Sequence, residues 1–120
     1  MFELSITGDI AAAHFLNGYD GKCKNLHGHT WKVEATVQCE ELNGLGMVAD
    51  FTDLKAKLQE VLELMDHGCL NDLPFFKENN PTTENIARHI FEQYGAKVKP
   101  LKLKTVRVWE SESSSVTYYE

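Results

Sequence analysis

Three histidines close together in the sequence are the residues best suited to chemistry. His14, His27 and His29 are three of the five histidines in the chain. His27 and His29 are two apart in an alternating segment, so both imidazoles would leave one face of a strand. His14 ends an earlier alternating segment on its apolar face, and pairing of the strands would bring the three rings together. Three neutral imidazoles suit Zn²⁺ and leave a coordination position open, as in catalytic zinc sites.

Any one of these histidines could simply be a half-buried residue, but three in phase with apolar faces favour a metal site. Cys23 lies four residues before His27 and admits three roles. It could be a fourth zinc ligand, a small buried residue or a catalytic group beside the metal. Positive charge from a metal ion would favour the thiolate form. Spacing alone does not choose between ligand and catalytic thiolate.

Two acidic positions could take part in the same chemistry. Asp66 precedes His67 at the expected end of a helix, where a carboxylate can orient an imidazole for proton transfer. The simpler interpretation is a protonated histidine stabilised by the helix C-terminus. Glu110 shares its strand parity with Val106 and Val108, so it should point inward and need a partner. A guanidine-like edge, either of an arginine or of a guanine or pterin ring, would satisfy it with paired hydrogen bonds; an exposed strand end would explain it equally well.

Length and composition restrict the class of protein. With 120 residues and 13.6 kDa, we expect one domain spanning residues 1–120. The net charge of −6 disfavours nucleic acid as the main ligand. No apolar run approaches the ~20 residues of a membrane span, and the N-terminus does not resemble a signal peptide. The three cysteines are widely spaced, which suits a reducing cytoplasm. We therefore expect a cytoplasmic protein without membrane or nucleic-acid partners.

Alternating apolar and polar residues predict the strands. The first runs from about residue 2 to 14, and the second begins near His27 and alternates through Glu40. A short strand at 47–48 follows a turn marked by Asn43 and two glycines. Two strands, at about 101–110 and 116–119, close the chain.

Two segments have the spacing of amphipathic helices. The first runs from Thr52, the expected N-cap, to about residue 65. The loop that follows holds Pro74 and residues 79–81. The second helix begins at Thr82 and Thr83, which are good capping residues. Segregated strands and helices predict an α+β fold with an antiparallel sheet.

The second helix has two further features. We expect Gly95 to be the residue that follows its C-terminus, since glycine favours that position. We expect His89 to be a solvated position with no function. Glu84 falls in the first turn, where an acidic side chain is favourable; a ligand role for it is secondary on this pattern.

Taken together, these residues resemble the 6-pyruvoyltetrahydropterin synthase family, over nearly the whole chain. The order and spacing of six motifs carry the resemblance. They are Ala12-Ala13-His14-Phe15, Cys23-x-x-x-His27-Gly28-His29, Gly46-Met47-Val48-x-Asp50-Phe51-x-x-Leu54-Lys55, Leu64-Met65-Asp66-His67-x-x-Leu70-Asn71, Pro81-Thr82-Thr83-Glu84-Asn85 and Val108-Trp109-Glu110.

The resemblance implies a fold and an assembly. The family has the tunnelling fold (T-fold), a four-stranded antiparallel sheet with two helices on one face. Its subunits close into barrels, typically a homohexamer built as a dimer of trimers, with active sites between subunits. We therefore expect an oligomeric barrel with intersubunit sites.

The resemblance also implies roles for individual residues. Cys23 would be the catalytic thiolate, and Asp66 with His67 would form a proton relay from a neighbouring subunit. Glu110 would anchor the ring of a small-molecule pterin triphosphate substrate. The zinc ligands would be His14, His27 and His29. Thr82, Thr83 and Glu84 would line the substrate recess.

The spacing between Cys23 and His27 is more similar to family members that make 6-carboxytetrahydropterin in the queuosine pathway. These are zinc-dependent carbon–carbon lyases, and their substrate is 7,8-dihydroneopterin triphosphate. The main alternative is a 6-pyruvoyltetrahydropterin synthase, which eliminates triphosphate and keeps the side-chain carbons. A second alternative, a pterin- or metal-binding module without turnover, has no need for a thiolate and a relay beside an open metal position.

Overall fold

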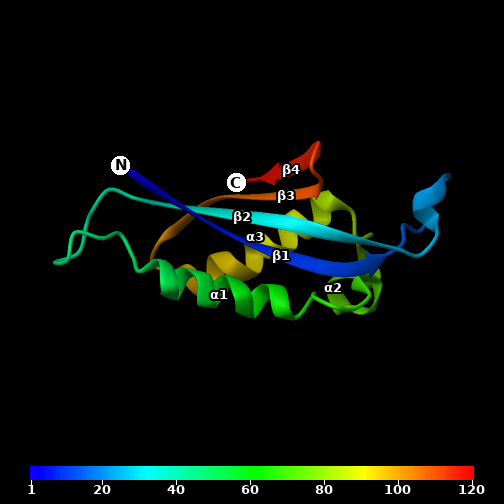
Figure 1. Cartoon of the computed structure of the whole chain (residues 1–120), viewed down its shortest axis with the longest axis horizontal. Coiled ribbons are helices and arrows are strands. Elements are labelled where there is room, and N and C mark those ends of the chain that lie inside the picture. Colours follow the sequence, from blue (N-terminus) through cyan, green and yellow to red (C-terminus); the bar gives the residue numbers. More distant parts are fainter.

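The computed structural model describes residues 1–120 as a twisted four-stranded sheet covered by helices on one face (Figure 1). All neighbouring strands are antiparallel, in the order β1-β2-β3-β4. The strands are β1 (Phe2–His14), β2 (His27–Cys39), β3 (Lys102–Ser111) and β4 (Ser114–Tyr118). The α-helices are α1 (Phe51–Glu63), α2 (Pro74–Glu78) and α3 (Thr83–Val98). The expected α+β class and T-fold sheet are confirmed.

The alternation that predicted β1 and β2 separates a buried face from an open one. Ile10 in β1 and Trp31 and Val33 in β2 are fully buried, whereas their sequence neighbours are more exposed. Helix α1 packs against β1, and α3 packs against β3 and β4 as well as against α1. One hydrophobic core therefore fills the space between this face of the sheet and the two long helices.

Three structural features converge at one end of this elongated molecule, which measures 53 × 24 × 23 Å. β1 ends there, and β2 and α3 both begin there (Figure 1). The segment of residues 15–26 projects from this end, and residues 40–50 project from the other. The fold thus gathers the end of β1 and the starts of β2 and α3, where most of the chemically suggestive residues lie.

The start of α1 differs from the prediction. Asp50, not Thr52, is the N-cap: its Oδ1 accepts a hydrogen bond from the Thr52 backbone N–H at 2.8 Å. Thr52 therefore lies inside the first turn. Both residue types cap helices well, so the sequence offered two candidates two residues apart, and the carboxylate also suits the positive end of the helix.

The expected strand at 47–48 is absent. The side-chain oxygen of Asn43 accepts hydrogen bonds from the N–H groups of Leu45 and Met47, at 2.8 and 3.1 Å. The Asn43 N–H in turn donates to the Met47 carbonyl at 2.8 Å. These bonds use the Met47 backbone within a turn, so it cannot join a strand ladder.

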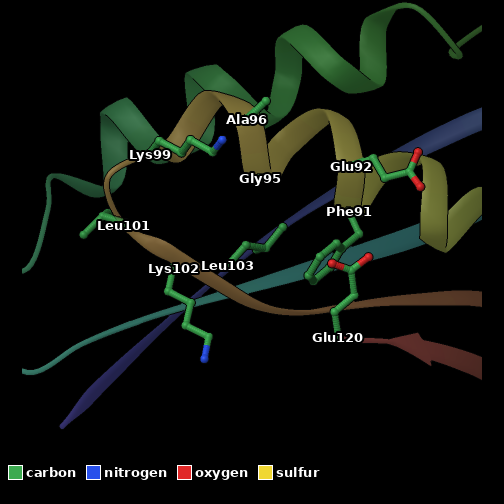
Figure 2. Close-up of a pocket in the computed structure, with 9 residues that line it drawn as sticks. All are labelled: Phe91, Glu92, Gly95, Ala96, Lys99, Leu101, Lys102, Leu103 and Glu120. Carbon is green, nitrogen blue, oxygen red and sulfur yellow. The ribbon is translucent and has the colours of Figure 1, made fainter.

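Helix α3 begins as predicted and ends later. Thr82 is its N-cap, with its hydroxyl accepting from the Asn85 N–H at 3.1 Å. Gly95 does not end the helix, which continues to Val98 (Figure 2). Tyr94 and Val98 are buried on either side of this glycine. Burial of such side chains outweighs the ~1 kcal/mol that a glycine costs inside a helix.

Short helix α2 was predicted to be loop, and its partner His89 was predicted to be solvated. Pro74 occupies the first turn of α2, a favourable place for proline, and Phe76 joins the core. The His89 ring stacks on Phe75, with centroids 4.6 Å apart, and meets the edge of Phe76 at 5.5 Å. Its Nδ1 atom is buried without a partner. The prediction for His89 was wrong because a polar residue type does not reveal which apolar rings will cover it.

None of these helices combines the length and apolar character needed to cross a lipid bilayer.

Candidate metal and substrate site

The three histidines lie together, as the sequence predicted. The β1–β2 register places His14 opposite His27, and Ala12 opposite His29. One ring nitrogen from each histidine lies within 4.8 Å of the others. The cluster is formed by the last residue of β1 and by the first and third residues of β2, so the antiparallel pairing of the two strands brings the rings together.

Backbone carbonyls set the tautomers of two of these rings. Nδ1 of His14 donates to the Pro81 carbonyl, and Nδ1 of His27 donates to the Asn25 carbonyl, both at 2.7 Å. A carbonyl can only accept, so each Nδ1 carries the hydrogen and each Nε2 is left with its lone pair. The two Nε2 atoms lie 3.0 Å apart. Two nitrogen lone pairs at this separation can both bind one cation, and the carbonyls act as outer partners of metal-binding histidines do.

The surroundings of His14 favour its neutral form. The side chain is nearly fully buried, and Trp31 contacts its ring edge-on, with centroids 4.9 Å apart. Burial is the main cause that holds the pKa of His14 below its ordinary value of 6.5. The hydrogen bond to Pro81 acts in the opposite direction, and the neighbouring His27 and His29 lower the pKa further. A neutral imidazole is the form that binds a metal.

Glu110 lies beside the cluster because of an irregularity in the sheet. The β3–β4 register shifts between Trp109 and Ser111, so Glu110 has no cross-strand partner there. Such bulges redirect a side chain and are common beside active sites. Oε1 of Glu110 lies 3.7 Å from Nε2 of His29, and the Glu110 side chain is 40% exposed. An acidic side chain therefore lies next to the candidate metal ligands.

Glu110 also lines a recess of about 120 Å³ together with the start of α3 and the β4 strand. Thr83 and Glu84 contribute from α3, and Thr83 is largely buried. Thr82 is not one of the residues that line this recess, and its hydroxyl caps α3. The structure thus brings together Glu110, Thr83 and Glu84, and leaves Thr82 in a structural position beside them.

Cys23 lies in a short 3₁₀ turn, Lys22–Lys24, within the projecting segment. It is half-buried, and its carbonyl accepts a hydrogen bond from the Leu16 N–H at 2.8 Å. Cys23 is not part of the histidine cluster. This placement gives no support to a fourth-ligand role and leaves the thiol available for other chemistry.

Asp66 and His67 form a pair, but they do not contact the cluster within this chain. Nδ1 of His67 lies 2.7 Å from Oδ2 of Asp66, and Oδ1 of Asp66 accepts from the Ala11 N–H at 2.8 Å. The Ala11 hydrogen bond, and then the His67 hydrogen bond, lower the pKa of Asp66. His67 has a left-handed backbone, with φ 59°, and its side chain is 82% exposed. Ala11 precedes His14 by three strand residues, or about 10 Å, and no hydrogen bond joins the pair to Cys23.

A larger cavity, about 410 Å³, lies between the last turns of α3 and the start of β3 (Figure 2). Lys99 and Lys102 line it, as do Glu92 and Glu120. None of the candidate site residues contributes to it.

Sequence reasoning missed the carbonyls of Pro81 and Asn25, which orient two histidines. The sequence placed Pro81 in the loop before the second helix, as the first residue of a family motif, without a link to His14. No sequence signal could have identified either carbonyl, because every residue carries one and only the fold decides which ring it meets.

Comparisons with known proteins agree with this geometry. A family model described as 6-pyruvoyl tetrahydropterin synthase matches residues 3–120. The chain is 32% identical to a 6-carboxy-5,6,7,8-tetrahydropterin synthase of Haemophilus influenzae, covering 100% of both chains. It is 39% identical to the human 6-pyruvoyl tetrahydrobiopterin synthase, over 82% of this chain and 70% of that one.

Solved structures give the same result. A 6-pyruvoyl tetrahydropterin synthase of Caenorhabditis elegans superimposes with a TM-score of 0.91 at 29% identity, covering 99% of this chain and 95% of that chain. The sequence match spans nearly the whole chain, and the structural match includes the sheet and the helices that position the histidine cluster. This chain belongs to the 6-pyruvoyl tetrahydropterin synthase family.

Proposed function

We propose that this protein is a 6-carboxy-5,6,7,8-tetrahydropterin synthase in queuosine biosynthesis. It would convert 7,8-dihydroneopterin triphosphate and one water into 6-carboxytetrahydropterin, acetaldehyde and triphosphate. The observation that carries the proposal is the 3.7 Å separation between Glu110 and His29. A carboxylate beside three histidines supports a role for Glu110 as an acceptor for a pterin ring next to a bound metal. Relatives named for this reaction support the choice of product.

The proposed metal is Zn²⁺, held by His14, His27 and His29. A zinc ion there would supply positive charge that stabilises negative charge on the side-chain oxygens of the substrate. The hydrogen bonds from Nδ1 of His14 and His27 support this assignment, because they direct both Nε2 lone pairs toward one point.

Glu110 would hold the pterin ring. Its carboxylate can accept two hydrogen bonds from the N–H groups of the ring, a paired and charge-assisted arrangement. Thr83 and Glu84 would complete the recess, with Thr82 fixing the start of α3 behind it. The redirected position of Glu110 at the bulge supports this role.

Cys23 would act as the base that removes the C1′ proton of the substrate. His67, oriented by Asp66, would carry protons during the tautomerisation that follows. Elimination of triphosphate and cleavage of the C1′–C2′ bond complete the conversion. The position of Cys23 outside the histidine cluster supports a catalytic role over a ligand role.

The relay would come from a neighbouring subunit of a homohexamer, a dimer of trimers with intersubunit sites. Two observations support this arrangement: His67 is 82% exposed in the single chain, and its ring bonds to Asp66 while no hydrogen bond joins it to Cys23. The net charge of −6 and three free cysteines support a cytoplasmic enzyme whose partner is a small molecule rather than nucleic acid.

A 6-pyruvoyltetrahydropterin synthase is the second candidate. Relatives with that activity in their names are 39–40% identical to this chain. Both enzymes would share the elimination of triphosphate, so the same residues serve either reaction. The two reactions differ in whether the C1′–C2′ bond is broken.

The test is to incubate zinc-replete protein with 7,8-dihydroneopterin triphosphate and to identify the pterin product by mass. The proposal predicts 6-carboxytetrahydropterin. A pterin that keeps all three side-chain carbons would establish the second candidate. Absence of turnover, with zinc bound, would indicate a binding module.

A further inference from the structure

Residues that follow α1 form hydrogen bonds with the outer edge of β1, near the end of that strand. The Ala13 N–H donates to the Gly68 carbonyl at 2.8 Å, and the Ala11 carbonyl accepts from the His67 N–H. Residue 13 also forms an isolated parallel bridge with Cys69. Odd-numbered residues therefore direct their backbone groups to this outer edge.

Two asparagine side chains continue this edge beyond β1. Asn71 Oδ1 accepts from the Phe15 N–H at 3.0 Å, and its Nδ2 donates to the Phe15 carbonyl at 2.9 Å. Asn80 does the same for Asn17, at 2.9 and 2.8 Å. A carboxamide carries the donor and the acceptor of a peptide group, so each asparagine replaces one residue of a missing neighbouring strand. We call these two pairs of hydrogen bonds the asparagine clasps.

Leu16 lies between Phe15 and Asn17, and its backbone N–H points to the opposite edge. Leu16 directs its N–H to the Cys23 carbonyl at 2.8 Å. This alternation is that of a β-strand, in which successive residues bond to opposite sides. The backbone of residues 15–17 thus lies between the two asparagine amides on one edge and Cys23 on the other.

We propose that Asn71 and Asn80 are positioning residues that fix the segment carrying the Cys23 thiol at the histidine end of the sheet. The inference rests on the base role proposed for Cys23. Residues 15–26 project from the end of the sheet (Figure 1), as connecting segments commonly do. Within the segment, the Leu16–Cys23 hydrogen bond is the backbone bond that joins its two sides. The asparagine clasps fix the backbone on both sides of Leu16, and through Leu16 they restrain Cys23.

Asn79 provides a matched control. It is adjacent to Asn80, but its Nδ2 donates to the Phe75 carbonyl, four residues earlier in the chain. It therefore stabilises the end of α2 and makes no bond to residues 15–17. A change at Asn79 alters the same loop without releasing the clasp.

The experiment compares zinc-loaded Asn71→Ala, Asn80→Ala and Asn79→Ala proteins with the unaltered chain. The measurements are kcat, KM, zinc content and the rate of iodoacetamide alkylation at Cys23, resolved from the other cysteines by peptide mass spectrometry. Asn71 is 8% exposed, so its variant could fail to fold. The hydrogen bonds between Asn80 and Asn17 are exposed, so the Asn80→Ala protein should fold and can decide the test by itself.

Both clasp variants should lose about 10–100-fold in kcat, since small misplacements of a reacting group have effects of this size. KM and zinc content should stay near those of the unaltered protein. Cys23 alkylation should become at least about threefold faster, because a loosened segment opens more often. Asn80→Asp, which keeps the acceptor and loses the donor, should recover part of the kcat. Asn79→Ala should match the unaltered protein.

Unchanged kcat and unchanged Cys23 alkylation in Asn80→Ala would overturn the inference. A fall in zinc content proportional to the fall in kcat would also overturn it, because the asparagine clasps would then position the metal ligands and not Cys23. The alkylation readout needs no turnover, so it tests the clasp separately from the proposed reaction. An inactive unaltered protein would count against the proposed function alone.

Discussion

The carbonyl of Pro81 accepts a hydrogen bond from Nδ1 of His14 at 2.7 Å. This bond joins the last residue of β1 to the residue just before the N-cap of α3. The residues that follow Pro81 lead directly into the recess lined by Thr83, Glu84 and Glu110. The orientation of a proposed metal ligand and the shape of the proposed substrate recess are therefore set by one segment of backbone.

Replacing His27 with alanine should weaken zinc binding. It removes one of three ligands, so affinity should fall by more than the roughly 10–100-fold typical of changes to outer partners. Zinc affinity can be measured by competition with a chromophoric chelator. His89→Gln is the control and should bind zinc normally, since His89 packs against Phe75 away from the cluster. Equal zinc affinity in His27→Ala and the unaltered protein would refute the metal site.

Replacing Glu110 with glutamine should raise KM by about 10–100-fold, because a hydrogen bond to a charged group is worth about 1.5–3 kcal/mol. Zinc content should not change. Steady-state kinetics on the pterin triphosphate measure the effect. Glu112→Gln, an exposed position on the same hairpin, should leave KM unchanged. An unaltered KM in Glu110→Gln would rule out the anchoring role.

Cys23→Ala should retain zinc and lose at least about 100-fold in kcat, the lower range for removal of a general base. Cys39→Ala is a matched control, because the Cys39 thiol only donates to the Glu41 carbonyl at the far end of β2. Metal analysis and single-turnover kinetics give the two readouts. Full activity in Cys23→Ala would show that another group removes the proton.

The stability of the fold should depend on pH through His89. Burial lowers the pKa of His89 below 6.5, with Glu92 acting in the opposite direction; the α2 groups that face its ring are the phenyl rings of Phe75 and Phe76. As pH falls through 6.5, the unfolded chain binds this proton first, so the free energy of unfolding decreases.

Urea unfolding at several pH values between about 7.5 and 5.5 measures this effect. The decrease in the free energy of unfolding should be smaller in His89→Gln than in the unaltered protein. His14 is present in both, so its contribution cancels in the difference. Identical pH dependence in the two proteins would contradict the buried, neutral state of His89.

Gly95→Ala should stabilise the protein by about 0.5–1 kcal/mol, the usual cost of a glycine inside a helix. A Cβ there would meet Cδ2 of Leu103 at 3.6 Å, an ordinary contact, and would point into the cavity of Figure 2. Thermal unfolding should show the gain as a higher Tm. A lower Tm would mean that the last turns of α3 are not helical.

The sequence was a good guide where one physical rule dominates. Alternation predicted the end of β1 at His14 and the start of β2 near His27, because a half-buried strand must bury every second side chain. The same rule placed His14, His27 and His29 in phase, and the hairpin register then brought them together. Their cluster is the part of the candidate site that could be predicted from the residues alone.

The sequence was a poor guide where tertiary contacts decide between similar choices. Asp50 and Thr52 are both good caps, and only the folded backbone selects Asp50. His89 of α3 stacks on Phe75 of α2, and no local pattern encodes a contact between residues so far apart in the chain. Asp66 and His67 are adjacent in sequence, but their distance from Cys23 depends on the fold and, in our proposal, on a second subunit.

The stoichiometry of products tests the central claim most directly. Zinc-replete protein should release one molecule of acetaldehyde for each triphosphate formed from 7,8-dihydroneopterin triphosphate, measured by coupled reduction of the aldehyde and by ion chromatography. This ratio requires that the C1′–C2′ bond breaks in every turnover. Triphosphate release without acetaldehyde would contradict the proposed reaction and assign the protein to the pyruvoyl branch of its family.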